Sequence, residues 1–375
     1  MDKKLSCIHL GHKHIPSREG GIEIVVEELA SRMANRGIDV TCLNRGGHPV
    51  DEMLVEGKRL KEYHGIKLKT IFTINVRGLA AMTASLSGAI FAAFSKADIV
   101  HFHAEGPCAT LWIPKLFGKK CIATIHGLDH QRAKWGCFAK RYIMSGEKCA
   151  VKYADAIIVL SENVQHYFAE TYQRETNFIP NGITSPKQQV IDKIKKWYLE
   201  KDEYILYLGR LVPEKGIQYL IKAFRKVKTD KKLVIAGDSG DSDDFVDELK
   251  CLANDDKRIL FTGFVTEEVA ELYSNAYSFV LPSDVEGMSL SLLEAMSYGN
   301  CCLVSDIPEC TEVVEDKAAV FPKGNVTKLQ AKIQQLCDEP AKVKAYKATA
   351  KKYICDKYNW DEAVDKTIAL YTNHD

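Results

Sequence analysis

Two glutamates eight positions apart, Glu286 and Glu294, enclose the segment EGMSLSLLE. Glu286 follows a strand-like stretch that turns at Pro282, so we place it in a loop. Glu294 lies one or two turns inside the helix that follows, which Gly299 is expected to terminate. Carboxylates accept hydrogen bonds from vicinal hydroxyls, so one glutamate suits a ribose and the other a hexose. The same spacing also fits a helix dipole compensated by Glu286 and an exposed helix face at Glu294.

Backbone groups at the start of this helix add a second kind of ligand contact. Gly287, Met288 and Ser289 precede the helix interior, so their N–H groups have no helical partner. Such groups suit a phosphate or the hydroxyls of a sugar. We therefore expect this loop to hold part of a phosphate-bearing ligand.

A cationic loop follows the strand-like segment YILYLG. The loop GRLVPEKG turns at Pro213 and opens a helix near Gly216. Arg210 and Lys215 therefore flank one loop at the end of a strand. An arginine fork and a lysine point charge match the oxygens and the negative charge of a diphosphate. Taken alone, the two residues also fit ordinary solvated loop charges.

A glycine pair, Gly20 and Gly21, directly precedes the helical pattern IEIVVEELA. Without side chains in the way, the backbone N–H groups and the positive end of the helix can approach an anion. Glycine turns are common, and no G-x-G-x-x-G fingerprint follows the first strand. The pair therefore gains weight only together with the other loops.

The elements that must position these loops alternate from end to end of the chain. Ten short β-rich runs are separated by amphipathic helical patterns, which predicts parallel sheets covered on both faces. The runs fall into two sets on either side of a turn-rich stretch at residues 177–190. We expect an N-terminal domain over 1–184, a C-terminal domain over 185–357, and a final helix over 358–375 that could pack on the first domain. Ligands of such sheets bind beyond the carboxyl ends of the strands.

The composition is that of a globular protein. The 375 residues are 46% hydrophobic and 27% charged, which fits two domains and argues against disorder. Lys and Arg outnumber Asp and Glu by 24 to 18 in residues 1–185, yet the whole chain carries a net charge of only +1. Because the basic excess is local and no recognised motif is present, nucleic-acid binding is the weakest function class.

Cysteines and apolar segments predict a cytoplasmic protein. None of the 12 cysteines forms a C-x-x-C pair, which indicates buried free thiols in a reducing compartment. The first residues lack the apolar core and cleavage site of a signal peptide. The apolar segment 79–94 is too short and too rich in small polar residues to span a bilayer. We expect no transmembrane helix.

Two histidine pairs have a spacing that can bind metal. His12 and His14, and likewise His101 and His103, stand two positions apart, which places both imidazoles on one face of a strand. No cysteine or carboxylate cluster accompanies them. We interpret them as polar loop or acceptor-site residues and expect no metal.

Residues 126–154 combine basic and aromatic side chains. The basic residues are Arg132, Lys134, Lys140, Arg141, Lys148 and Lys152, and they alternate with Trp135, Phe138 and Tyr142. Such a segment suits an anionic membrane surface or a lipid pyrophosphate acceptor. A solvated pair of amphipathic helices fits the pattern equally well.

In their order and spacing, the motifs resemble the retaining glycosyltransferases of family 4. The resemblance covers nearly the whole chain and rests on REGGIEIVVEELA, ATIHGLD, IVLSE, IPNGI, LGRLVPEKG and EGMSLSLLEAMSYGNCCLVSD. It implies the GT-B fold, an α/β architecture of two facing Rossmann-like domains with parallel sheets. The segment HIPSREGG and residues 126–154 are also similar to family members that build bacterial surface polysaccharides.

The resemblance implies a role for each candidate residue. Glu294 is implied to bind the donor ribose and Glu286 the hydroxyls of the transferred sugar, while the two cations neutralise the diphosphate. His126, after the strand-like CIATI, is implied to lie near the reacting carbon. The implied catalytic residues are His126, Arg210, Lys215 and Glu286. The implied donor-binding residues are Gly20, Gly21, Arg210, Lys215, Glu286, Gly287, Met288, Ser289 and Glu294.

The implied reaction transfers a hexosyl or deoxyhexosyl group, with retention, from a UDP-, GDP- or dTDP-linked donor to a glycan or lipid-linked acceptor. Arg210 and Lys215 stabilise the leaving diphosphate, so no cofactor and no metal are expected. The enzyme is expected in the cytoplasm, with the inner face of the plasma membrane as a further location.

Two other functions remain open. A nucleotide-sugar 2-epimerase has the same fold, although such enzymes lack GRLVPEKG followed by the paired glutamates. A catalytically silent nucleotide-sugar-binding subunit is the other alternative, which only an assay distinguishes from an enzyme.

Overall fold

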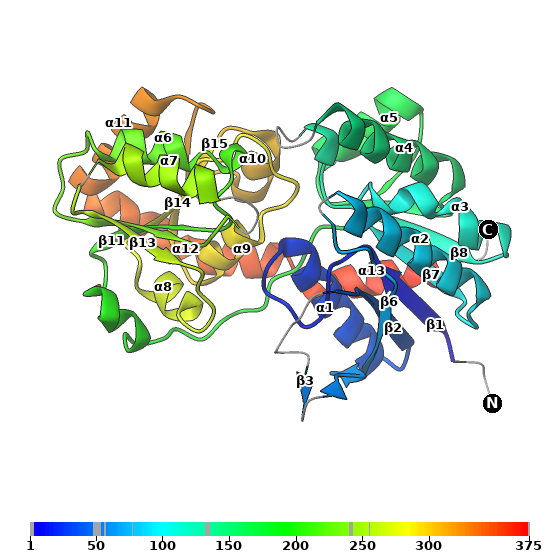
Figure 1. Ribbon diagram of the computed structural model, residues 1–375. Coiled ribbons are helices and arrows are strands. Elements are labelled where there is room, and N and C mark those ends of the chain that lie inside the picture. Colours follow the sequence, from blue (N-terminus) through cyan, green and yellow to red (C-terminus); the bar gives the residue numbers. More distant parts are fainter. Residues whose placement is uncertain are drawn as a thin grey trace. The chain divides into compact units, whose positions relative to one another are not determined.

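The computed structural model describes residues 4–47, 54–55, 58–76, 78–131, 136–239, 243–254 and 256–373. The chain forms two compact units, unit 1 from Met1–Gly182 with Trp360–Asp375 and unit 2 from Ile183–Asn359. Each unit is built on one large sheet whose strands are parallel except at one edge of unit 1 (Figure 1). The predicted α/β class with two Rossmann-like, parallel-sheet domains is confirmed.

The unit 1 sheet has eight strands in the order β10-β9-β8-β7-β1-β2-β6-β5. These strands are β1 (Ser6–Leu10), β2 (Asp39–Arg45), β5 (Glu62–Tyr63), β6 (Ile66–Ile71), β7 (Ile99–His103), β8 (Lys120–Ile125), β9 (Ala156–Val159) and β10 (Asn177–Phe178). A separate ribbon pairs β3 (Leu54–Val55) with β4 (Lys58–Arg59). The central strands are buried on both faces, so β8 reads as a nearly continuous apolar run, whereas β7 carries two buried histidines among its apolar residues.

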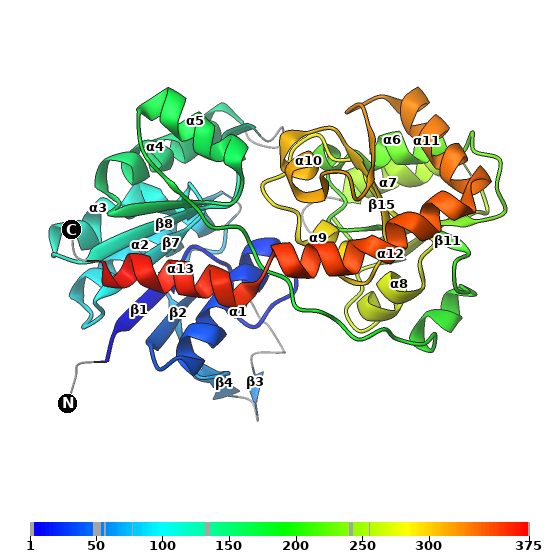
Figure 2. The same cartoon turned by 180° about the vertical axis from the view of Figure 1, so that it is seen from behind.

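Helices cover both faces of the unit 1 sheet (Figures 1 and 2). They are α1 (Gly21–Asn35), α2 (Leu79–Phe94), α3 (Trp112–Leu116), α4 (Cys137–Tyr153), α5 (Glu162–Tyr172) and α13 (Trp360–Thr372), with short 3-10 turns η2 (Pro107–Thr110) and η3 (Asp129–Gln131). One apolar core joins β1, β7 and β8 to α2, α4 and α5, and includes Phe102 and Phe168.

The last helix, α13, lies in unit 1 beside α1, although the whole of unit 2 precedes it in the chain (Figure 2). Trp360, Val364 and Tyr371 are buried along it. Arg36, just after α1, forms ion pairs with Asp361 and with Asp365 on α13 at 2.9 and 2.8 Å. This helix therefore completes the unit that the first 182 residues begin.

The unit 2 sheet has six strands, all parallel, in the order β13-β12-β11-β14-β15-β16. They are β11 (Tyr204–Leu208), β12 (Lys232–Ala236), β13 (Ile259–Gly263), β14 (Ser278–Leu281), β15 (Cys301–Ser305) and β16 (Ala319–Phe321). The helices are α6 (Ile217–Phe224), α7 (Asp243–Ala253), α8 (Val269–Asn275), α9 (Leu290–Ser297), α10 (Pro308–Val314), α11 (Val326–Asp338) and α12 (Pro340–Lys357), with turns η4 (Lys193–Trp197) and η5 (Pro213–Lys215). A second core, which includes Phe224 and Phe321, lies within this unit.

The ten β-rich runs expected from the sequence all form strands of these two sheets. The helix after the paired-glutamate loop ends at Ser297, and Gly299 adopts a left-handed φ of 79°, as expected for a helix terminator. The sequence did not predict β3, β4, β5, β6, β10 and β16. Strand β6 alternates lysines with apolar residues, and the other five are only two or three residues long.

Candidate active site

The loops after β11 and β14 meet at the point where the strand order of unit 2 reverses. Counted along the chain, its order is 3-2-1-4-5-6, so the first and fourth strands are neighbours and their following helices diverge. Asp284 N–H donates to Glu214 O at 2.8 Å, which ties the two loops together. Gly216, at φ 69°, lets them approach, because a Cβ there would lie 2.0 Å from Pro282 O. In doubly wound sheets this crevice is where ligands bind.

Lys215 and Glu286 form an ion pair at this reversal point. The Lys215 ammonium donates to both carboxylate oxygens of Glu286, at 2.6 and 2.7 Å. The two side chains are only 16% and 6% exposed. Ser283 Oγ also donates to Glu286 Oε1 at 2.6 Å, which fixes the carboxylate. The lysine therefore presents a positive charge whose position is set by the protein rather than by solvent.

A buried tyrosine, Tyr207, links further candidate residues to this pair. Its hydroxyl donates to Arg210 O at 2.9 Å. Burial raises the pKa of Tyr207 well above its ordinary value, the carboxylates of Glu286 and Glu214 raise it further, and the Arg210 guanidinium lowers it. The charges of Arg210 and Glu286 thus act on one hydroxyl. Tyr207 was missed in the sequence because it stands in an apolar strand and reads as core.

Glu214 was missed as well. It is buried, and both of its carboxylate oxygens lack a hydrogen-bond partner among the described residues. Its position directly before Lys215 in the chain places an acid at the point where the strand order of unit 2 reverses.

Glu294 lies in the second turn of α9, partly exposed, as the sequence reading expected. Its carboxylate acts on the buried hydroxyl of Tyr273, whose pKa is raised well above its ordinary value first by burial and then by Glu294. Ser289 stands at the N-cap position of the same helix without a side-chain capping bond, and its hydroxyl shares a hydrogen bond of 3.0 Å with that of Ser291. Gly287 and Met288 belong to the loop before the helix, and the side chain of Met288 is buried.

The sheet order of unit 1 reverses between β1 and β7. Gly11, at φ 113°, brings the loop after β1 against the end of β7, since a Cβ there would lie 2.2 Å from His103 O. Gly20 is the N-cap of α1 and Gly21 is its first residue, so the helix begins one residue earlier than the glycine pair suggested. The buried carboxylate of Glu23 lies over this N-terminus, where it accepts a hydrogen bond from Lys13 N–H at 2.8 Å. An anion bound at α1 would therefore meet a carboxylate.

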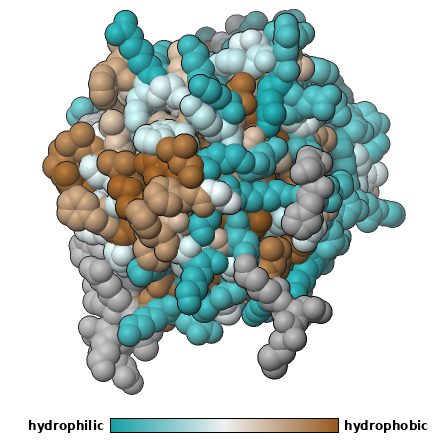
Figure 3. All heavy atoms as spheres, turned by 90° about the vertical axis from the view of Figure 1, so that its right-hand side faces the viewer, coloured by the Kyte–Doolittle hydropathy of each residue, from teal (hydrophilic) through white to brown (hydrophobic). Residues whose placement is uncertain are grey.

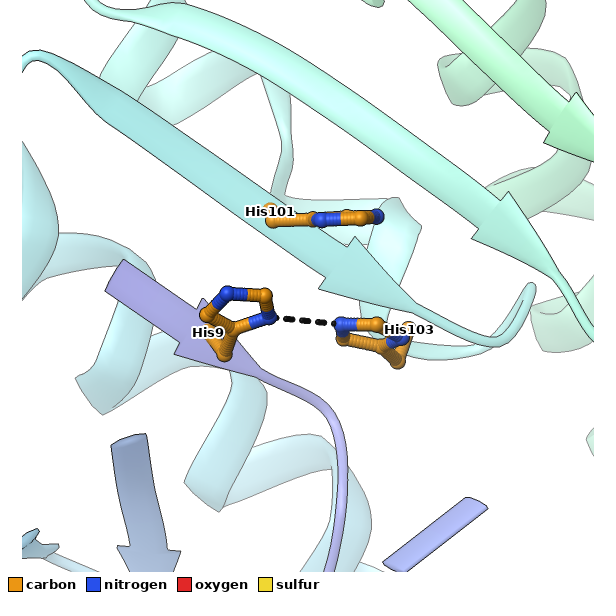
Figure 4. A group of neighbouring side chains, drawn as sticks. All are labelled: His9, His101 and His103. Atoms are coloured by element: carbon orange, nitrogen blue, oxygen red, sulfur yellow. Dashed lines mark hydrogen bonds between the residues drawn. The ribbon is translucent and has the colours of Figure 1, made fainter. Parts of the chain in front are cut away.

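His126 follows β8 and is the outer member of a row of three imidazoles. His103 Nδ1 lies 3.1 Å from His126 Nε2. On its other side, His103 Nε2 lies 2.9 Å from His9 Nδ1, the contact drawn as a dashed line in Figure 4. Burial lowers the pKa of His9 to about 3 and that of His103 well below its ordinary value. Both rings are therefore neutral, and in each contact the ring N–H of one histidine donates to the unprotonated ring nitrogen of the next. This row holds the ring of His126 in one orientation.

His101 faces the same cluster, and its ring stacks on that of His103 at 4.3 Å, as the two-residue spacing predicted. Its nitrogens are both engaged, by the hydroxyl of Tyr371 at 2.6 Å and that of Thr124 at 2.7 Å. His12 Nε2 contacts Asn44 Oδ1 at 3.1 Å. The histidines flagged by spacing thus serve hydrogen bonds inside the unit.

Part of the basic and aromatic segment lies outside the described residues, including Arg132, Lys134 and Trp135. On α4, Phe138 is 73% exposed, and Arg141, Lys148 and Lys152 are also exposed. Asp241 and Asp243, with one residue between them, form an Asp-x-Asp triplet of the kind that can bind a metal. Residues 240–242 lie outside the described ranges. Within the described ranges, no helix is long and apolar enough to cross a bilayer.

Two Rossmann-like units of this kind define the GT-B class of glycosyltransferases, and the solved structures of that class named below match 98–99% of the chain. Sucrose-phosphate synthase of Thermosynechococcus elongatus has a TM-score of 0.82 at 21% identity, covering 98% of each chain. WaaG, a glycosyltransferase involved in lipopolysaccharide biosynthesis, has a TM-score of 0.78 at 16% identity, covering 99% of this chain and 100% of WaaG.

The chain belongs to glycosyltransferase family 4, so the resemblance seen in its motifs is confirmed. Residues 19–185 match the family model for Glycosyltransferase Family 4, and residues 190–353 match the model for Glycosyl transferases group 1. An uncharacterized glycosyltransferase of Methanocaldococcus jannaschii is 26% identical, covering 93% of this chain and 97% of its own. The O-antigen chain mannosyltransferase B of Escherichia coli is 30% identical over 48% of each chain.

Proposed function

We propose that this protein is a retaining, metal-independent glycosyltransferase that moves a hexosyl or deoxyhexosyl group from a nucleoside diphosphate to a lipid-linked glycan. The observation that carries the proposal is the Lys215–Glu286 ion pair at the strand reversal of unit 2. A diphosphate is the ligand that a fixed, partly buried ammonium suits best, with Arg210 as a second cation in the same loop.

Transition-state charge explains why the pair is useful. As the bond from the anomeric carbon to the diphosphate breaks, negative charge grows on the leaving oxygens, and Lys215 and Arg210 stabilise it without reorganising. Glu286 keeps the ammonium in place and still has lone pairs to accept a sugar hydroxyl. Glu294 accepts the ribose hydroxyls from the second turn of α9, and the N–H groups of residues 287–289 bind phosphate oxygens.

Retention follows from a front-face substitution in this proposal. The acceptor oxygen bonds to the anomeric carbon on the face that the diphosphate leaves, and the acceptor proton passes to the departing phosphate oxygen. No carboxylate in the described chain is assigned as a covalent nucleophile, which a double displacement requires. His126, held by the neutral His103, contributes a hydrogen bond to the sugar near the reacting carbon.

An apolar patch on unit 1 supports an acceptor that is held at a membrane. On α2, the exposed residues Leu86, Ile90 and Phe94 follow one another at four-residue spacing, and Phe94 meets Phe117 beside α3 at 4.7 Å. Leu116 is 73% exposed on α3. Figure 3 shows hydrophobic side chains gathered on this face. Apolar and aromatic side chains exposed together on adjacent helices suit the interface of a bilayer that carries a lipid-linked acceptor.

Relatives guide the choice of donor and acceptor. The HepE protein of Anabaena has been solved with UDP and glucose, and a TarM variant of S. aureus has been solved with UDP. These structures support testing UDP sugars first, with GDP and dTDP sugars beside them. The O-antigen mannosyltransferase relative supports a role in bacterial surface polysaccharide synthesis.

A donor screen tests the proposal. The protein is incubated with separate UDP, GDP and dTDP sugars and a lipid-linked acceptor, products are detected by mass spectrometry, and the anomeric configuration is read by NMR. We expect one donor to give a product with the donor's configuration, at a rate that added Mg²⁺ or Mn²⁺ does not change. An inverted product would overturn retention. A donor epimerised without acceptor would identify an epimerase, and donor binding without turnover would identify a binding subunit.

A further inference from the structure

Three side chains that the proposed reaction does not use converge inside unit 1. Glu105 follows β7, His130 lies in η3, and Glu147 lies in the middle of α4. Both glutamate side chains are fully buried, and the histidine side chain is 17% exposed. Helix α4 can approach this closely because it carries Gly146, where a Cβ would lie 2.0 Å from Glu105 O.

One oxygen of each carboxylate is held by a donor from the surrounding structure. Tyr167 OH donates to Glu147 Oε1 at 2.9 Å, and Tyr172 OH donates to the same oxygen. The backbone N–H of Asp129 donates to Glu105 Oε2 at 2.8 Å. These bonds fix both carboxylates and turn their remaining oxygens toward His130.

The three remaining atoms face one another without a hydrogen bond. Glu105 Oε1, Glu147 Oε2 and His130 Nδ1 are each buried and lack a hydrogen-bond partner among the described residues. His130 Nδ1 lies 3.5 Å from Glu105 Oε1 and 3.4 Å from Glu147 Oε2. All three atoms lie within 4.8 Å of one another.

The two distances from His130 Nδ1 to the carboxylate oxygens suit ligands of a shared metal ion better than a direct hydrogen-bonded ion pair. A charge-assisted N–H···O bond is about 2.7–2.9 Å long, and neither contact reaches that length. Ligands about 2.0–2.2 Å from a tetrahedral zinc stand about 3.4 Å apart. The observed distances match the edge of that tetrahedron.

We propose that Glu105, His130 and Glu147 bind a divalent transition-metal ion, with Zn²⁺ as the best match. Carboxylate oxygens and an imidazole nitrogen are all ligands of zinc, whereas Ca²⁺ takes six to eight oxygens and Mg²⁺ an octahedral shell. Tyr167, Tyr172 and the Asp129 N–H hold the ligating carboxylates from behind, as the outer partners of metal ligands do.

Burial raises the pKa of Glu105 to about 8, and the two carboxylates raise the pKa of His130 to about 9. Both shifts favour protonation, so a metal ion would compete with protons here and would compensate both carboxylates at once.

Such an ion would be structural. His130 lies four residues after His126, so the ion would fasten the segment that carries His126 to α4 and to the end of β7. The inference goes beyond the proposed function, because it concerns the folding of unit 1 and not the diphosphate. Its test needs no donor and no acceptor.

Metal binding is measured on the full chain after treatment with a chelator and gel filtration. Zn²⁺ is titrated in competition with a chromophoric indicator, and the bound metal is counted by mass spectrometry after dialysis. We expect one equivalent bound by the wild type, with a rise in melting temperature on metal addition. Co²⁺, used as a probe, should give visible bands of a tetrahedral site without a thiolate charge-transfer band. Less than one tenth of an equivalent bound, or a thiolate band, would overturn the proposal.

Variants locate the ion. Glu147→Gln keeps an oxygen for the two tyrosines, so its fold is expected to persist by circular dichroism. Because it removes a ligand, we expect zinc affinity to fall by more than the roughly 10–100-fold that the loss of an outer partner costs. Glu105→Gln should behave in the same way. His9→Gln is the matched control, because it alters the other buried group of three possible ligands, His9, His101 and His103. Zinc retained in both glutamate variants, or lost in His9→Gln, contradicts the assignment.

Discussion

At the scale of single residues, the ion pair of Lys215 and Glu286 acts as one unit. Each partner neutralises the other in a place where solvent reaches little of either side chain. Removing one partner of a buried pair leaves the other charge uncompensated, which costs more than the pair itself contributes. Substitutions here should therefore affect both the local structure and the binding of a diphosphate.

The substitution Lys215→Met should lower kcat by about 10²–10³-fold, because it removes a fixed cation from the leaving group. The measurement is steady-state turnover of the donor found in the screen, with kcat and KM determined separately. Lys323→Met is the control, since this exposed lysine also lies near the loop after β14, with Nζ 3.3 Å from Asp284 O. We expect the control to stay within about twofold of the wild type. Equal turnover in both variants would remove Lys215 from the site.

At the scale of elements, glycines determine how closely the loops pack at the points where the strand order of each sheet reverses. Gly216 joins η5 to α6. Because it has no Cβ, the loop after β14 can pack directly against it. Gly11 does the same in unit 1 against β7. In both units, the loop after the first strand thus packs against the end of a neighbouring strand, β7 in unit 1 and β14 in unit 2.

Gly216→Ala should destabilise unit 2 and abolish tight donor binding. Its Cβ would lie 2.0 Å from Pro282 O, so the two loops must separate. Gly324→Ala is a matched control, because φ is 70° there against 69° at Gly216 and nothing lies within 4 Å of its Cβ. We expect the control to cost about 1–2 kcal/mol for its backbone conformation alone, and Gly216→Ala to cost more. Thermal unfolding and calorimetric titration with the donor nucleotide measure the two effects, and equal losses would show that packing at Pro282 is unimportant.

The exposed patch of α2 and α3 gives a second prediction at this scale. Changing Phe94 and Leu116 together to serine should weaken binding to anionic vesicles at least tenfold, because burying one such side chain contributes about 1.5–3 kcal/mol. Flotation with anionic and neutral vesicles measures the effect. Val190→Ser is the control, as Val190 is 83% exposed on unit 2. Wild-type protein that fails to float with either vesicle would refute the membrane contact.

At the scale of the whole molecule, the two units differ in how they respond to acid. No histidine occurs between residues 183 and 359, so all 11 histidines of the chain belong to the sequence of unit 1. Burial lowers the pKa of His9 to about 3 and of His12 to about 4, and it lowers that of His101 well below its ordinary value. Near His12, Glu23 raises the pKa and Arg45 lowers it, so burial remains the dominant effect.

We expect acid to destabilise unit 1 before unit 2. These histidines stay neutral in the folded unit, while in the unfolded chain they bind protons below about pH 6.5. The unfolded state therefore binds more protons, and stability falls as the pH drops from about 6.5 toward 4, by about 1.4 kcal/mol per pH unit for each histidine. Hydrogen-exchange mass spectrometry between pH 6.5 and 5, corrected for intrinsic rates, reports each unit separately. His9→Gln should reduce the slope in unit 1, and a parallel loss in both units would contradict this account.

The motif loops could be predicted from the sequence because local chemistry decides them. Apolar runs bounded by glycine and proline predicted the ten main strands, and the carboxyl ends of parallel strands share an edge, so Arg210, Lys215 and Glu286 were expected in one site. Lys215 and Glu286 do meet there.

What the sequence could not reveal depends on pairing between distant segments. Tyr207 reads as core because its strand is apolar, and only the fold places its hydroxyl beside Arg210 and the charge of Glu286. Glu105, His130 and Glu147 come from three elements and share no motif spacing.

The chain by itself determined its class, its two sheets and the loops that bear charge, because propensity, periodicity and turn residues act over a few positions. The tertiary structure decided which strands are neighbours, how α13 completes unit 1 and which buried polar atoms face one another. The physical reason is that burial and hydrogen bonding join residues far apart in the chain, and their partners are fixed only when the sheets have formed.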